Sequence, residues 1–222
     1  MRGVTLRRAG VGIHGWGMVG VSSFSGGIGA AIAGGRAEDI LFCVVSGAMV
    51  GVLNHLANEI SLERALENAG FKGNHTANWT NEEIATNMAK IFPDLYEAAN
   101  RPKFELKDYI PTKSGVSAMG QAQKSIEIIG GKFVVTSKGL IYLHRSLTSS
   151  IREMASVAGH ELNHVADYVS GAYAGWANKY NSTKTANWYS ERNAYGWEIS
   201  VDSPFKNQAK FDEYNNLING LK

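Results

Sequence analysis

The feature that most constrains the fold of this chain is the run from His160 to His164, which reads HELNH. Residues four apart lie on one face of an α-helix, one turn above each other. In a helix, both imidazoles could therefore turn one nitrogen to a common point, at the ~2.0–2.1 Å of a zinc–nitrogen bond. Ser150 and Glu153 form a capping-box pattern upstream, so we expect this helix to run from Ile151 to Val169.

Glu161 follows the first histidine of the run. Its carboxylate can reach a water molecule at the ion without occupying the ion itself. A zinc ion there would lower the pKa of that water toward ~7 and polarise a carbonyl group. Glu161 would accept the proton and later deliver it to the leaving amine. We therefore predict a zinc-dependent hydrolase site with His160 and His164 as ligands and Glu161 as the catalytic acid and base.

A catalytic zinc usually takes three protein ligands and keeps one position for water. The best acidic candidates lie on one face of a predicted helix over about Trp188 to Val201. We choose Glu191 as the third ligand, with Glu198 next and His144 as a more distant alternative. Tyr195, on the same face, could donate a hydrogen bond to a developing oxyanion. The other interpretation of this face is a salt-bridged, partly solvated helix surface.

Asp167 lies seven residues after His160, nearly on the same face. Seven residues span about 10.5 Å of helix axis, which is too far for a short carboxylate to reach the shared point. We expect Asp167 either to orient His164 or to be an ordinary surface aspartate. Gly159 lies inside the predicted helix at a cost of about 1 kcal/mol relative to alanine, which either the close approach of a neighbouring strand or substrate, or plain tolerance, explains.

Capping and periodicity signals elsewhere predict an α+β fold. We expect an irregular segment over residues 100–122 and three further helices, which are Leu62 to Ala69, Thr80 to Ile91 and Phe205 to the C-terminal end. We also expect a β-hairpin, with strands Lys132 to Thr136 and Leu140 to Arg145 around a turn at Ser137-Lys138-Gly139.

The pattern His160-Glu161-x-x-His164 followed by Glu191-x-x-Ala194 resembles the gluzincin branch of zinc metallopeptidases, the thermolysin-like group. That resemblance covers roughly residues 130–202. It implies a zincin-like fold, with the active-site helix beside a small antiparallel sheet and other helices before and after. It also implies that a glutamate from a second helix completes the zinc site. Tyr195 is a departure, because many gluzincins have an aspartate there.

The chain changes composition near residue 58. Residues 1–58 are Gly-rich and apolar, and we interpret them as a linker or pre-toxin segment that precedes a metallopeptidase domain over residues 59–222. This front segment resembles the region before the C-terminal toxin domain of bacterial polymorphic toxins. The resemblance implies a toxin that is secreted or delivered into a target cell, a protein or peptide substrate, and a cognate immunity protein. No conventional signal peptide is recognisable.

Charge and cysteine content exclude some classes of protein. The formal net charge of +2 and the scattered Lys and Arg residues argue against a nucleic-acid partner. Cys43 is the single cysteine, so an internal disulfide framework is excluded.

The competing functional hypothesis is a non-enzymatic membrane-inserting or assembly module, in which the Gly-rich segment contacts the membrane and both histidines are structural.

Overall fold

The computed structural model describes residues 61–72 and 76–221. The predicted front segment of residues 1–58, Cys43 included, lies outside the described residues, so its interpretation and its boundary stay predictions. The described part is α+β, as expected. Its elements are α3 (Leu62–Asn68), α4 (Asn81–Ile91), α5 (Pro93–Ala98), β1 (Lys103–Lys107), β2 (Gly120–Ile129), β3 (Lys132–His144), the 3₁₀ helix η1 (Arg145–Ser149), α6 (Ile151–Val169), α7 (Ala172–Lys179), α8 (Thr183–Ser200) and α9 (Gln208–Asn219).

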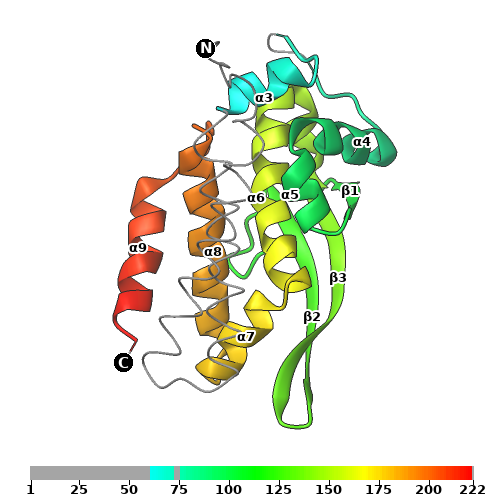
Figure 1. The fold of residues 1–222 in the computed structure, drawn as a ribbon. Coiled ribbons are helices and arrows are strands. Elements are labelled where there is room, and N and C mark those ends of the chain that lie inside the picture. Colours follow the sequence, from blue (N-terminus) through cyan, green and yellow to red (C-terminus); the bar gives the residue numbers. More distant parts are fainter. Residues whose placement is uncertain (1–60, 73–75, 222) are drawn as a thin grey trace, which may run out of the picture. The chain divides into compact units, whose positions relative to one another are not determined.

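Helix α6 is the centre of the fold and lies between the sheet and α8 (Figure 1). It has the predicted bounds, and the Ser150 hydroxyl accepts a hydrogen bond from the backbone N–H of Glu153 at its start. Fifteen of its residues are buried, on nearly all sides of the helix. A helix buried all round must be covered on both faces. Here β2 and β3 cover one face and α8 covers the other.

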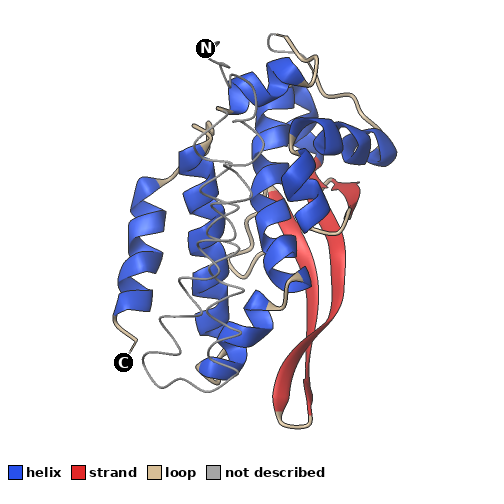
Figure 2. Cartoon of the chain, in the orientation of Figure 1, coloured by secondary structure: helices blue, strands red, loops and turns tan. Residues whose placement is uncertain are grey.

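The sheet has three strands in the order β1-β3-β2 (Figure 2). Strand β2 pairs antiparallel with β3, whereas β1 pairs parallel with β3, from Lys103 opposite Leu140 to Lys107 opposite His144. The expected antiparallel sheet is therefore a mixed one. Strand β1 also lies inside the segment that we expected to be irregular.

The β-hairpin of the structure differs from the predicted one. Residues Lys132 to His144 form one continuous strand, and the turn lies at Gly130-Gly131, where both residues have positive φ angles. Gly139, expected in a turn, has φ +93° within β3, where the pairing with β2 shifts register. The turn signal at Ser137-Lys138-Gly139 was wrong because a β-bulge needs the same left-handed glycine as a turn.

Helices α3, α4, α8 and α9 follow the predictions with shifted ends, whereas α5 and α7 were not predicted. Helix α4 has the full capping box between Thr80 and Glu83. Helix α8 begins earlier than expected, at Thr183, because the Ser182 hydroxyl caps it. Helix α9 begins at Gln208, later than the expected Phe205. None of the helices in the described residues is both long enough and apolar enough to cross a membrane.

Candidate metal centre

Two histidines of α6 face α8 with their Nε2 atoms close together. His160 Nε2 lies 3.2 Å from His164 Nε2. Two nitrogen ligands of a tetrahedral zinc ion are separated by about 3.3 Å, which follows from bond lengths of ~2.0–2.1 Å. The helical spacing of four thus brings the two ring nitrogens to a separation that one shared metal ion would allow.

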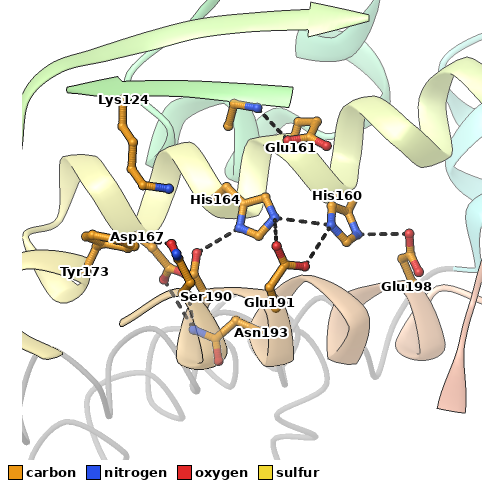
Figure 3. A network of polar contacts seen from close by, with 12 residues as sticks. Lys124, His160, Glu161, His164, Asp167, Tyr173, Ser190, Glu191, Asn193 and Glu198 are labelled. Carbon is orange, nitrogen blue, oxygen red and sulfur yellow. Dashed lines mark hydrogen bonds and ion pairs between the residues drawn. The ribbon is translucent and has the colours of Figure 1, made fainter. Parts of the chain in front are cut away.

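Glu191 comes from α8 and reaches between the two rings (Figure 3). Its Oε1 lies 3.7 Å from His164 Nε2, and its Oε2 lies 3.8 Å from His160 Nε2. The three residues each offer a ligand atom within 4.8 Å of the others, so they could hold a metal ion. The Glu191 side chain is the most exposed of the three, at 33%, so the cluster is open to solvent beside it.

The outward nitrogen of each histidine has a hydrogen-bond partner on α8. His160 Nδ1 lies 3.0 Å from Glu198 Oε1, and His164 Nδ1 lies 2.8 Å from Ser190 Oγ. A carboxylate only accepts, so His160 Nδ1 must be the donor in the first pair. Glu198, an alternative third ligand, thus faces the side of His160 away from the cluster and orients that ring. Such outward partners fix the tautomer that leaves Nε2 free for a metal.

Asp167 orients His164 through Ser190. The Asp167 carboxylate is fully buried and hydrogen bonds with Ser190 and with Asn193, whose Nδ2 lies 3.2 Å from Oδ1. Burial raises the pKa of Asp167 to about 7, while the two hydrogen bonds oppose that rise. Asp167 therefore acts on His164 indirectly, through Ser190. This agrees with the first of our two interpretations of Asp167.

The two rings differ in their tendency to take up a proton. Burial favours a neutral His160, but the hydrogen bond with Glu198 and the charges of neighbouring carboxylates outweigh it and raise the pKa of His160 to about 9. Burial and the positive charge of His160 hold the pKa of His164 well below its ordinary value. The two Nε2 atoms lie 3.2 Å apart, so the pair takes up a proton on His160 more readily than on His164.

Glu161 points away from α8, toward strand β2. Its Oε2 accepts a hydrogen bond of 2.6 Å from the backbone N–H of Ala122. Gly120 makes this approach possible, because a Cβ atom there would lie 2.8 Å from Glu161 Cγ. Burial raises the pKa of Glu161 to about 7, against the opposing charge of His160.

A cleft of about 600 Å³ opens over the cluster. That volume lies within the roughly 300–1,000 Å³ that is usual for ligand pockets. Its walls come from β2, α6, α8 and α9, and the cluster and Glu161 form part of its floor. The other lining residues are Gly120, Gln121, Ala122, Lys124, Tyr168, Lys184, Asn187, Trp188, Glu213, Tyr214 and Leu217.

Tyr195 and His144, two other predicted site residues, lie outside this lining. The Tyr195 ring packs edge-on against His160, with centroids 5.1 Å apart, and stacks on Tyr214. Its role as an oxyanion donor stays a prediction. His144 Nδ1 is bonded to Ser146 Oγ at 2.8 Å at the start of η1, and His144 is not part of the His160 cluster that the described residues form.

Sequence reasoning missed Lys124 and Tyr168, which line the cleft, and Ser190, which orients His164. Tyr168 carried a usable signal, because it continues the spacing of four from His160 and His164 along α6. Lys124 carried none, since its strand was not recognised.

No protein-family model matches the chain, and searches of curated proteins and of solved structures found no match either.

Proposed function

We propose that this protein is a zinc-dependent hydrolase, and specifically a metallo-endopeptidase. The observation that carries the proposal is the convergence of His160, His164 and Glu191 on one point beside Glu161, at the floor of the cleft. Two imidazoles and one carboxylate are a donor set typical of catalytic zinc, which keeps a further position open.

The residues around the cluster also fit a zinc ion. Both outward ring nitrogens are engaged by α8, so both inward nitrogens can present lone pairs. A bound zinc ion would supply Lewis-acid activation of a water molecule and of a substrate carbonyl. His160, His164 and Glu191 would hold it, while Glu198 and Ser190 keep the two imidazole rings in a fixed orientation.

Glu161 handles the protons in this proposal. Its carboxylate takes a proton from the water whose oxygen attacks the carbonyl carbon, and the carbonyl electron pair moves onto oxygen. The C–N bond then breaks, and Glu161 returns the proton to the amine nitrogen. The Ala122 N–H fixes one carboxylate oxygen, which keeps the side chain at the cleft in a defined orientation.

The position of strand β2 favours an extended peptide as the substrate. Strand β2 is at the edge of the sheet, and Gly120 to Ala122 line the cleft. Within the described residues its outer edge has no strand partner, so an extended peptide could add to it beside Glu161.

We extend the proposal to a secreted toxin or effector. This extension rests on the composition of residues 1–58, and an immunity protein would oppose such a toxin.

The test begins with metal analysis of the full-length protein. We expect about one zinc ion per chain after mild purification, and less than a tenth of that for His160→Ala. The second measurement is cleavage of fluorescein-labelled casein by wild type and Glu161→Gln. The near-isosteric variant should keep its zinc and lose at least ~100-fold in rate, the scale of lost general acid–base catalysis. A zinc-free wild type, or a fully active Glu161→Gln, contradicts the proposal.

Expression in bacterial cells tests the toxin assignment separately. Growth arrest by the wild type that Glu161→Gln relieves would support a catalytic toxin. Arrest that persists in Glu161→Gln, together with dye leakage from liposomes, would favour the membrane-inserting alternative.

A further inference from the structure

Lys124 places a positive charge in the cleft beside the metal cluster. The side chain reaches from β2 toward α6 next to His164 (Figure 3). Its Nζ lies 3.0 Å from the Tyr168 hydroxyl and 4.7 Å from the ring centroids of both Tyr168 and Tyr173. Two aromatic faces and a phenol thus hold the ammonium in one position.

Lys124 has acidic neighbours but forms no ion pair within the described residues. Glu161 and Glu191 attract it through space, but in the described part of the chain neither carboxylate forms an ion pair with it. Burial lowers the pKa of Lys124, which reflects an incomplete replacement of its hydration. A divalent ion on Glu191 would neutralise part of that attraction and repel the ammonium. An anionic group that enters the cleft would offset this repulsion.

Tyr168 adds a hydrogen-bond donor at the same place. An ammonium only donates, so the Tyr168 oxygen must accept from Lys124 and its own O–H hydrogen must point elsewhere. No residue in the described ranges accepts that hydrogen. Tyr168 lies one helical turn beyond His164, and the two rings stack with an interplanar angle of 9°. The free donor therefore belongs to the same helix face as both predicted histidine ligands.

We infer that Lys124 and Tyr168 form an oxyanion-binding pair, which stabilises the negative oxygen that develops when water adds to the substrate carbonyl. The inference rests on the proposed hydrolase function and gives this pair the role that the sequence suggested for Tyr195. The electron pair displaced onto the carbonyl oxygen would face a fixed ammonium and a phenol in a partly buried cleft. Preorganised donors act most strongly in such surroundings.

The experiment uses two probes on the zinc-loaded full-length protein. Methylphosphonate is a tetrahedral anion like the reacting centre, whereas acetohydroxamate chelates zinc without a tetrahedral anion. We expect Lys124→Met and Tyr168→Phe to weaken methylphosphonate binding at least tenfold and acetohydroxamate binding less than twofold. Lys124→Arg, which keeps the charge, should retain methylphosphonate binding within about threefold. With casein as substrate, Lys124→Met should lower kcat and leave KM within about twofold.

Lys138→Met is the matched control. Lys138 Nζ lies 3.5 Å from the main-chain oxygen of Tyr168 but does not line the cleft, so its loss should leave both probes unaffected. Methylphosphonate binding that is unchanged in Lys124→Met overturns the inference, and a loss in Tyr195→Phe with none in Tyr168→Phe overturns the role of Tyr168. Zinc analysis reports separately on the proposed function. If the wild type holds no zinc, that function fails, and methylphosphonate titration of the metal-free protein decides whether Lys124 binds anions.

Discussion

The indole ring of Trp197 occupies the space that a side chain at Gly159 would need. A Cβ atom built on Gly159 would overlap the six-membered ring of Trp197, which is 2% exposed. Gly159 directly precedes His160 on α6, and Trp197 directly precedes Glu198 on α8. The close approach of these two residues therefore sets the distance between the helices that carry the predicted metal ligands.

Gly159→Ala should destabilise the protein. Overpacking of a core costs roughly 1–3 kcal/mol, while removing a helical glycine returns at most about 1 kcal/mol. We expect a lower midpoint in urea unfolding and a weaker zinc affinity, since α8 must move away from α6. Gly196→Ala is the control, because its Cβ would meet only the edge of the Phe211 ring at 3.1 Å. A Gly159→Ala protein as stable as wild type, with zinc bound as tightly, would contradict this role of Trp197.

The outward partners of the histidines should matter nearly as much as the ligands themselves. Glu198→Ala and Ser190→Ala each remove a hydrogen bond that orients one ring, so we expect 10–100-fold weaker zinc binding above pH 9, where a proton on His160 no longer competes with the ion. Competition with a chromophoric chelator measures this. Glu213→Ala is the control, because Glu213 lines the cleft but pairs with Lys210. Equal zinc affinity in Glu198→Ala and wild type would show that the His160 ring needs no such support.

Local sequence signals predicted the helical half of this site. The spacing of four places His160 and His164 on one face, and Ser150 fixes where α6 begins. Glu191 could be chosen because helix periodicity puts it on one face with Glu198. The sequence could not predict which glutamate faces both rings and which one contacts only His160. That difference depends on how α8 packs against α6, and the contact between Gly159 and Trp197 sets this packing.

The part of the site that strand β2 contributes could not be predicted, for a different reason. Gly139 gives the same left-handed backbone to a bulge as to a turn, so the sequence alone could not separate the two. Without the true hairpin, Lys124 had no assigned strand and no reason to face α6. Its position depends on the pairing of β2 with β3, which is a long-range property of the chain.

Zinc binding should release a proton and strengthen as the pH rises. His160 has a pKa of about 9 in the metal-free protein, so it is protonated at pH 7 and must lose that proton to bind zinc. The apparent affinity should therefore rise about tenfold per pH unit between pH 6.5 and 8. Calorimetry in two buffers of different ionisation enthalpy counts the protons released. Glu198→Gln removes a cause of the raised pKa, so it should release fewer protons near pH 8. An affinity independent of pH over this range would contradict the assignment of the proton to His160.

Gly120→Ala should separate catalysis from metal binding. A Cβ atom there would lie 2.6 Å from Val157 Cγ1 and 2.9 Å from Glu161 Oε1, so strand or carboxylate must shift. The hydrogen bond from Ala122 to Glu161 would lengthen, while the three predicted ligands on α6 and α8 stay in place. Because a misplaced catalytic group loses on the order of 100-fold in rate, we expect kcat on casein to fall at least tenfold with full zinc content. Gln121→Ala, a change at the exposed neighbouring position, should keep kcat within about twofold. Zinc loss in Gly120→Ala in proportion to activity would instead mean that β2 supports the metal cluster rather than the orientation of Glu161.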